Sequence, residues 1–324
     1  LVMTYIASLM STWVFFAGPG AYYRGGLGYW ISEMSYIALF PIIAHFTMNK
    51  VWIVNQEKGG TLVTPADFYY ERFKSNALRT ILGIILLVSA VPYVTSTLVA
   101  IAQAAQYATD GAINYRMAVI VIGLTMTIFV CIGGMKSAAM AGTVQGLLFI
   151  AMLWVIVIAC LIVGFGGSLP AAVGNLWENT QSFFSYPGPS GWTPYAARFG
   201  YPFSCAIGWT IMLPHVFVRS GYFGDNMKTQ RKLSFLTPVL QAVVWTGTMM
   251  IGLIGLALVS NMTASESELI IPYLVKNFVL DFSPVLATVL MIGFFVGSAA
   301  VGLSTANAFL GVSAAIVSSD LIKN

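Results

Sequence analysis

Long stretches without a charged residue alternate with short polar segments along this chain of 324 residues. Allowing for polar ends and tilt, each stretch can hold at least one helix of about 20 residues, the length that crosses the apolar part of a bilayer. The second stretch, residues 34–49, is too short by itself, but residues 27–54 reach that length if Glu33 faces the protein interior. The pattern therefore predicts eight membrane-spanning helices. They fall in residues 1–23, 34–49, 80–109, 117–135, 137–177, 199–218, 233–265 and 282–319.

The composition is that of an integral membrane protein. Apolar residues make up 58% of the chain, charged residues only 8%, and the mean hydropathy is +0.83. A soluble domain carries about 25% charged residues. The three cysteines lie within apolar stretches, so we expect no disulfide framework. The net charge of +4 gives no indication of a nucleic-acid partner, and the expected surroundings are the lipid bilayer.

Basic residues are divided unevenly between the two sides that the predicted helices define. Lys and Arg are enriched in cytoplasmic loops, so the side with eleven of them should be cytoplasmic and the side with four external. Both ends of this segment are then inside the cell, and the protein is expected in the inner or plasma membrane. The larger set is Lys50, Lys58, Arg72, Lys74, Arg79, Lys136, Arg219, Lys228, Arg231, Lys232 and Lys323, and the smaller set is Arg24, Arg116, Arg198 and Lys276.

Two apolar stretches contain polar interruptions, one at residues 7–12 and the other at Ser304 and Thr305. A hydroxyl in a membrane helix either bonds to a carbonyl of its own helix or points to a partner inside the protein. Taken alone, the pair at 304 and 305 is explained by the first alternative. If the chain unwinds at 7–12, however, the carbonyls of Ala7 and Met10 lose their helix donors. A sodium ion between these carbonyls and the two hydroxyls would satisfy both sets, which indicates an ion-coupled transporter.

Two further side chains are candidates for a role inside the membrane. Glu33 is the only carboxylate well inside a predicted span, and such acids usually mark a substrate or ion path. The alternative is a place near the outer interface, with Arg24 as counter-ion. His215 follows Pro214 in a span whose Gly and Pro residues permit a kink, and kinked spans line cavities in many membrane proteins. As a single histidine, it is more commonly a structural hydrogen bonder than a proton relay.

We expect no enzymatic activity from this chain. The sequence contains no G-x-S-x-G, H-E-x-x-H or P-loop motif. With two histidines and three scattered cysteines, a metal cluster is not expected either.

Four short motifs occur in order along the chain. Gly-Gly-Met-Lys-Ser at 133–137, followed by Val-Gln at 144–145, resembles GG-x-[KR]-[AS]…[IV]-Q, and 64–73 is similar to T-x-x-[DE]-[FY]…RF. Ile-Ser-Glu at 31–33 resembles the acidic stretch of a proline-transporter branch, and 302–308 is similar to a sodium-site segment, x-x-[ST]-[ST]-x-[DN]. Together these motifs resemble the sodium:solute symporter family, which includes proline, glucose, pantothenate and monocarboxylate symporters. The resemblance covers nearly the whole chain.

This resemblance implies an all-α integral membrane protein with a LeuT-type inverted-repeat helical bundle. Such a bundle has two inverted five-helix repeats, a site at the bilayer midplane and alternating access. The family core needs ten helices and this chain provides about eight, so the expected bundle is incomplete, either trimmed or degenerate. The implied division is a first five-helix repeat over 1–166, an external loop over 167–197, and the first three helices of the inverted second repeat over 198–324.

The resemblance also implies site residues and one departure from the family pattern. The family usually has Trp-Thr-Asp where this chain has Met140-Ala141-Gly142, so an acid tied to ion movement in relatives is absent. The residues that would bind sodium are Ala7, Met10 and Val301 through carbonyls, and Ser304 and Thr305 through hydroxyls. The residues that would line the solute site are Val14, Glu33, Tyr93, Trp209 and Thr210, with His215 added from its kinked span.

The sequence thus predicts a sodium-coupled symporter of a small polar organic solute, with Na⁺ as the coupling ion. An organic acid or an amino acid is the expected solute, although no Lys or Arg is expected inside the membrane to pair with an anionic group. Two alternatives stay open. One is a symporter-like sensory domain of a signalling protein, and the other is a degenerate family member with altered ion coupling.

Overall fold

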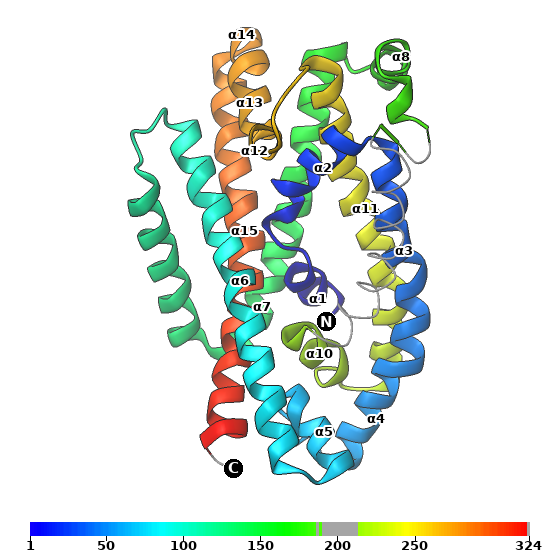
Figure 1. Ribbon diagram of the computed structural model, residues 1–324, viewed down its shortest axis with the longest axis vertical. Helices are drawn as coiled ribbons and strands as arrows, with labels where there is room; N and C mark the ends of the chain where they lie inside the picture. The colour runs from blue at the N-terminus through cyan, green and yellow to red at the C-terminus, as the bar shows by residue number, and fades with distance from the viewer. Residues whose placement is uncertain (186–187, 190–212, 323–324) are drawn as a thin grey trace.

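The computed structural model describes residues 1–185, 188–189 and 213–322, and within these ranges every regular element is a helix (Figure 1). The elements of the first half are α1 (Val2–Leu9), η1 (Thr12–Val14), α2 (Ala17–Gly25), α3 (Leu27–Ile43), η2 (Ala44–Met48), α4 (Asn49–Glu57), α5 (Pro65–Phe73), α6 (Asn76–Ala108) and α7 (Tyr115–Phe165). The elements of the second half are α8 (Leu169–Asn179), η3 (Gln181–Phe183), α10 (Pro214–Gly221), α11 (Met227–Leu258), α12 (Ala264–Ser267), α13 (Ile270–Leu274), η4 (Val275–Val279), α14 (Leu280–Phe282), α15 (Pro284–Ile316) and η5 (Val317–Ile322).

Six helical stretches among the described residues are long and apolar enough to cross a bilayer. Two of them lie within α7, and Figure 1 shows the first at the left edge of the molecule, apart from the second. The prediction of a multi-pass helical membrane protein is therefore confirmed. The six stretches are Ile37–Glu57, Asn76–Ala108, Tyr115–Ile132, Met140–Phe165, Met227–Leu258 and Pro284–Ile322.

One of the predicted spans is not a continuous long helix, and another is described only in part. Residues 1–23 are divided among α1, η1 and α2, because the backbone is extended at Met10 and Ser11. Of the span predicted over 199–218, only the part from residue 213 onward is described, and it begins the short helix α10. The first predicted span is therefore a broken helix.

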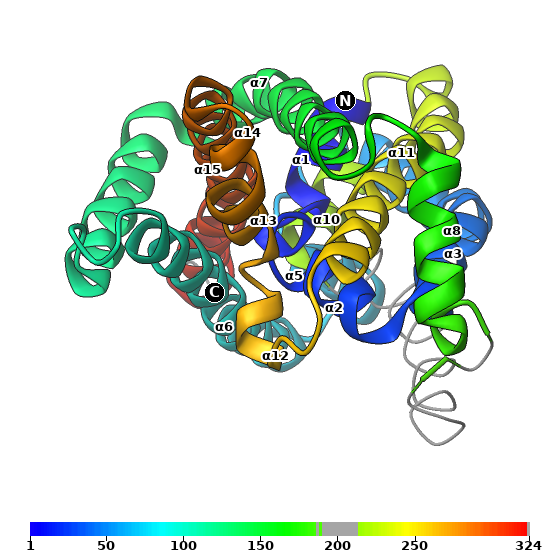
Figure 2. The same cartoon turned by 90° about the horizontal axis from the view of Figure 1, so that it is seen from above.

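The helix α1 lies at the centre of the bundle, packed against α7, α10, α11 and α15 (Figure 2). Tyr5, Ile6 and Ala7 have no exposed surface, and Met10 is 1% exposed. The same apolar core contains Phe149 and Leu153 of α7 and residues of α11 and α15. Because α1 is surrounded on all sides, polar groups at its end must find their partners within the protein.

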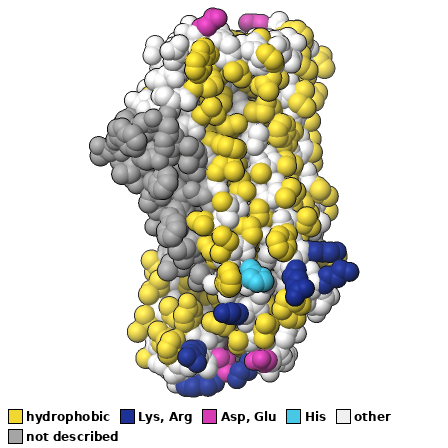
Figure 3. All heavy atoms as spheres, turned by 90° about the vertical axis from the view of Figure 1, so that its right-hand side faces the viewer, with side chains coloured by type: hydrophobic (Ala, Val, Ile, Leu, Met, Phe, Trp, Pro, Cys, Tyr) yellow, Lys and Arg dark blue, Asp and Glu magenta, His cyan; other side chains and the backbone are white. Residues whose placement is uncertain are grey.

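The outer surface of the bundle is apolar over its middle. On α6, Ile81, Ile85 and Val88 are 54%, 56% and 67% exposed, and on α15 the side chains of Val289 and Ile292 are similarly exposed. Figure 3 shows hydrophobic side chains over the middle of one face, with Lys and Arg gathered toward its lower part. We call the end of the molecule toward which these Lys and Arg side chains gather, formed by α4, α5 and η5, the basic end. A lipid environment accounts for an apolar band of this kind.

A network of polar contacts joins four elements at the basic end. Thr64 caps α5 by accepting from the Asp67 backbone N–H at 3.1 Å, and Asp67 accepts from the Thr64 N–H at 2.9 Å in return. Arg79 of α6 donates to Asp67 at 2.5 Å and to Asp320 of η5 at 2.7 Å. The Tyr222 hydroxyl, directly after α10, donates to the Thr64 carbonyl at 2.8 Å. α5, α6, α10 and η5 are therefore connected to one another.

At the opposite end, α2 is connected to the segment that follows α11. The Tyr23 hydroxyl donates to the Val259 carbonyl at 3.0 Å and accepts from the Met262 N–H at 3.1 Å. Arg24 donates to the Ala264 carbonyl at 3.0 Å. Both parts of the broken helix pack against α11, while α1 also contacts α10 and α2 also contacts α12.

Helices α2 and α11 approach each other closely at Gly252. A Cβ atom at this position would overlap the Pro19 carbonyl oxygen and lie 2.6 Å from the Cβ of Tyr22. Only a residue without a side chain fits here without a shift of the α2 backbone.

We predict that Gly252→Ala lowers the thermal unfolding midpoint in detergent, because overpacking of this kind costs about 1–3 kcal/mol. Gly174→Ala is the matched control, since Gly174 lies in α8 and no atom lies within 4 Å of an added Cβ. Alanine in an exposed helix should raise the midpoint slightly. Equal midpoints for the two variants would show that α2 and α11 are not packed as described.

Candidate functional site

The break after α1 begins where the sequence turns polar. Met10 has φ −72° and ψ 128°, and Ser11 has φ −108° and ψ −175°, so both are extended. The Ser11 hydroxyl accepts from the Trp13 N–H at 3.2 Å and so caps η1. The Met10 N–H donates to the Ile6 carbonyl at 2.8 Å and is the last helical bond of α1. Carbonyls after Ile6 must therefore be satisfied from outside the helix.

Three carbonyl groups converge on the hydroxyl of Thr305 in α15. Its Oγ1 lies 2.6 Å from the oxygen of Met10, 3.0 Å from that of Val301 and 3.5 Å from that of Ala7. A threonine hydroxyl has a single hydrogen and can serve one acceptor fully at a time. The arrangement therefore contains more acceptors than this donor can satisfy, in a part of the protein with no exposed surface.

The neighbouring hydroxyl, Ser304, is fully buried and has no hydrogen-bond partner within the described part of the chain. A Cβ atom at Gly142 of α7 would lie 3.4 Å from its Oγ and 2.8 Å from the Thr4 hydroxyl. Gly142, at the position where the resemblance implies an acid, thus lets α7 pack closely against α1 and α15.

The residues present fit a small hard cation. Their donor atoms are all oxygens, three from carbonyls and two from hydroxyls, and hard cations prefer oxygen ligands. The end of α1 also carries the negative end of its helix dipole. A cation at this place would use the surplus acceptors around Thr305 and the unpartnered Ser304 hydroxyl.

The structure brings the predicted sodium residues Ala7, Met10, Val301 and Thr305 together, with Ser304 beside them. A membrane-helix hydroxyl was expected either to bond to its own helix or to point to a partner inside the protein. The Thr305 hydroxyl does both, since it lies near the Val301 carbonyl of its own helix and near carbonyls of the unwound segment.

Two predicted solute-lining residues border the break. Tyr93 lies on α6, which packs against η1 of the break, and its ring centroid lies 4.6 Å from that of Phe309. Val14 is fully buried, and its carbonyl accepts from the Thr248 hydroxyl at 3.2 Å. Trp209 and Thr210 lie outside the described residues.

Glu33 is buried on α3, with 5% of its surface exposed. Arg24, the alternative counter-ion, donates instead to the Ala264 carbonyl and the Ser267 hydroxyl of α12. Within the described residues no ion pair joins Glu33 to Arg24. The place of Glu33 relative to the outer interface stays a prediction.

His215 makes a structural hydrogen bond within the core. Its Nε2 lies 3.0 Å from the carbonyl oxygen of Ser8, and since a carbonyl only accepts, Nε2 carries the hydrogen. The His215 ring has no exposed surface and lies against Phe309, with 3.8 Å between ring centroids.

Arg219 corrects one expectation from the sequence. The charge pattern counts it among the basic residues of the cytoplasmic side, where a loop residue is expected to be exposed, but Arg219 is only 4% exposed. It lies on α10, one turn after His215, and donates to the Thr4 carbonyl at 3.2 Å. Its burial results from the packing of the short helix α10 against α1, which the sequence alone does not show. The only local signal is its place directly after an apolar run.

Trp13 is a second residue that sequence reasoning missed. Its ring stacks on Tyr29 of α3 with 6.1 Å between centroids, and meets Trp245 of α11 edge-on at 4.9 Å. These contacts join the break to α3 and α11. An aromatic residue directly after the polar pair Ser11 and Thr12 was the available signal.

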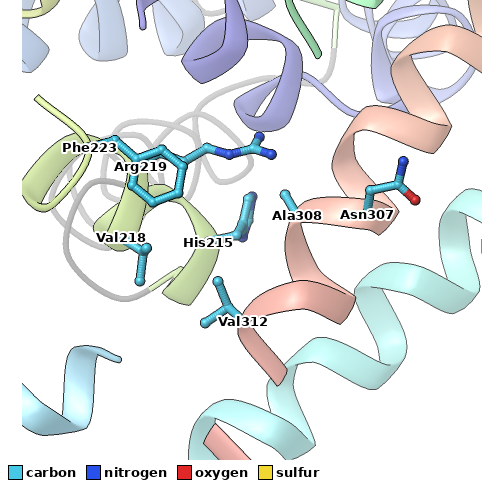
Figure 4. Close-up of a pocket in the computed structure, with 7 residues that line it drawn as sticks. All are labelled: His215, Val218, Arg219, Phe223, Asn307, Ala308 and Val312. Atoms are coloured by element: carbon cyan, nitrogen blue, oxygen red, sulfur yellow. The ribbon is translucent and has the colours of Figure 1, made fainter. Parts of the chain in front are cut away.

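A small cavity lies between α10 and α15 (Figure 4). Its α15 residues, Asn307, Ala308 and Val312, follow Thr305 toward η5, so the cavity lies on the basic-end side of Thr305. Its volume is about 10 Å³, room for about one water molecule. In Figure 4, His215 and Val218 of α10 face Ala308 and Val312 of α15. The lining residues are His215, Val218, Arg219, Phe223, Asn307, Ala308 and Val312.

Comparison with known proteins relates the chain to membrane transporters. The sequence model of the sodium:solute symporter family matches residues 1–324. The sodium/pantothenate symporter of Haemophilus influenzae is 26% identical over 266 residues, which cover 82% of this chain and 53% of that protein. The Escherichia coli sodium/pantothenate symporter is 25% identical, over 81% of this chain and 53% of its own length. The chain therefore spans about half the length of these curated relatives.

A solved structure supports the fold. The structure of a Na⁺-coupled sialic acid symporter in a substrate-bound outward-open state superposes with a TM-score of 0.80 and 15% sequence identity. The match covers 99% of this chain and 66% of that one. The LeuT-type helical bundle that the motifs imply is thus confirmed.

We predict that Ser304→Ala leaves the thermal stability nearly unchanged in buffer without sodium, where choline replaces it. Its buried hydroxyl has no partner in the described residues, and removing such a group is neutral or slightly stabilising. The change should be within about 0.5 kcal/mol of zero. A large loss of stability in choline buffer would show that Ser304 has a structural bond that the described contacts lack.

Proposed function

The chain belongs to the sodium:solute symporter family, and we propose that it carries a small polar organic solute across the cell membrane together with Na⁺. One observation carries this proposal most directly. The broken end of α1 directs two carbonyls at a hydroxyl of α15, and these elements come from opposite ends of the chain. A cation between them would hold together two helices that must separate when transport proceeds.

We propose that the basic end faces the cytoplasm, because Lys and Arg concentrate on the cytoplasmic side of membrane proteins. Both ends of this segment are then inside the cell. The cavity between α10 and α15 lies on the cytoplasmic side of the Thr305 cluster, and we assign it to the route by which the cation leaves. The Asp67–Arg79–Asp320 network lies beyond it and holds the cytoplasmic elements together. Residues 1–166 and 198–324 would form the inverted repeats, joined by 167–197.

An organic acid or an amino acid is the solute class we propose. The named solutes of similar proteins, pantothenate and sialic acid, both carry a carboxylate. Helix ends at a break offer fixed partial charges to such a group. Tyr93 and Val14 border the break and remain our candidates for contact with the solute, together with Glu33, Trp209 and Thr210. His215 is less suited than its kinked span suggests, because its Nε2 is already bonded to Ser8.

A family member with altered ion coupling is the second candidate. Gly142 stands where relatives have an acid, and its close packing against Thr4 leaves no room for a longer side chain without a shift. This observation favours coupling through the single oxygen site around Thr305. The third possibility, a sensory domain, is distinguished by solute accumulation in vesicles, which a sensor does not perform.

We predict that Thr305→Val strongly weakens the stabilisation of the purified protein by sodium. Sodium should raise the unfolding temperature of the wild type relative to choline, since a ligand that binds only the folded state stabilises it by mass action. Valine keeps the shape of threonine but removes the hydroxyl between the three carbonyls. The variant should need at least about tenfold more sodium for the same shift, as expected for loss of one ligand worth about 1.4 kcal/mol.

The matched control is Thr288→Val, in the same helix. Its hydroxyl bonds only to the Pro284 carbonyl of its own helix at 2.9 Å and is exposed, so its sodium response should equal that of the wild type. In vesicles, uptake of a radiolabelled organic acid should depend on a sodium gradient in the Thr288→Val protein and not in the Thr305→Val protein. Identical sodium responses in the two variants would reject the site.

A further inference from the structure

The carbonyls at the broken end of α1 are divided between two sets of partners. Ala7 and Met10 face the Thr305 hydroxyl of α15. Ser8, which lies between them in sequence, faces the other way and accepts from Nε2 of His215 at 3.0 Å. An unwound helix end directs its carbonyls to several sides, and any buried carbonyl without a donor is costly. His215 therefore satisfies the one carbonyl of this group that points away from the cation site.

A second bond of the same kind occurs one helical turn away. Arg219 donates to the Thr4 carbonyl at 3.2 Å. His215 and Arg219 are four residues apart on α10, and Ser8 and Thr4 are four residues apart on α1. Positions i and i+4 lie on one face of a helix, so the two bonds join one face of α10 to one face of α1, with the helices running in opposite directions.

Both donors are committed to this contact. His215 has no exposed surface and Arg219 is 4% exposed. All acidic residues of the chain lie in its described part, and none of them forms an ion pair with Arg219. A buried guanidinium without a carboxylate is costly, so its bond to α1 needs a reason beyond the neutralisation of charge.

We propose that His215 and Arg219 are positioning residues of the cation site. Their bonds to the Ser8 and Thr4 carbonyls fix the position of α1 along its own axis and its rotation about that axis. In this position the Ala7 and Met10 carbonyls point to Thr305. This inference rests on the proposed function, and it adds that α10, which contributes no ligand itself, sets the affinity of the site. When α1 moves to release the cation, these two bonds change together with the ligands, which is the differential contact that coupling requires.

His215 gives the cleaner test of the two residues. With its hydrogen on Nε2 and Nδ1 unpartnered in the described structure, the ring is neutral. Replacing it therefore changes the position of α1 without changing the electric field at the cation. Removing Arg219 would do both, and the loss of a nearby positive charge opposes the loss of positioning.

The experiment measures the sodium concentration that gives half of the maximal thermal stabilisation, at constant ionic strength with choline. His215→Leu should raise this concentration about three- to tenfold, as expected for one hydrogen bond of typical net strength. His215→Gln retains an N–H donor at similar reach and should restore most of the affinity. His45→Leu is the matched control, because His45 is exposed and lies on η2, and it should not change the affinity.

Arg219→Lys is the second variant and keeps the positive charge. The ammonium group presents its donors differently from the guanidinium, so sodium affinity should fall by about two- to fivefold. This variant also provides the test if His215→Leu does not fold. An unchanged half-maximal concentration in a folded His215→Leu or Arg219→Lys protein would overturn the inference for that residue.

The outcomes separate this inference from the proposed function. If the wild type gains no stability from sodium, the proposed function fails and the inference fails with it. If the wild type and His215→Leu respond to the same sodium concentrations while Thr305→Val needs at least about tenfold more sodium, the cation site stands and only the positioning role is rejected. A weakened His215→Leu protein that is restored by His215→Gln supports both.

Discussion

The rest of this structure depends on how main-chain carbonyls are satisfied where a helix ends inside a membrane protein. α1 stops at Leu9 in the middle of the bundle, where no water-exposed surface is near. Its terminal carbonyls must find donors or a cation among neighbouring helices. The Thr305 hydroxyl of α15 lies within hydrogen-bond distance of two of these carbonyls, and Nε2 of His215 in α10 donates to a third. The relative positions of α1, α10 and α15 follow from this one requirement.

The sequence was informative wherever a local pattern decides the structure. The uncharged stretches identified the helices that become α6, α11 and α15, because length and hydropathy alone select a membrane span. The polar residues at 7–12 and the pair at 304 and 305 indicated two interruptions, and the structure places them side by side. The sodium role of these residues remains a prediction.

What the sequence does not show is which side of a helix end faces which neighbour. Arg219 was counted among loop cations because it follows an apolar run, and only the packing of α10 against α1 buries it. The division of the Ala7, Ser8 and Met10 carbonyls between two helices is likewise a property of three-dimensional packing. Charge and hydropathy patterns describe a residue's average surroundings, whereas these contacts depend on distances between segments about 200 or more residues apart.

The different attachments of α1 and α2 have a mechanical consequence. Tyr23 and Arg24 fasten α2 to the segment after α11, whereas His215 and Arg219 fasten α1 to α10. One continuous stretch of chain is thus attached at two places to different elements, with the extended residues Met10 and Ser11 between the two attachments. An extended backbone at this point lets the chain change direction between the two attachments without breaking a helical turn.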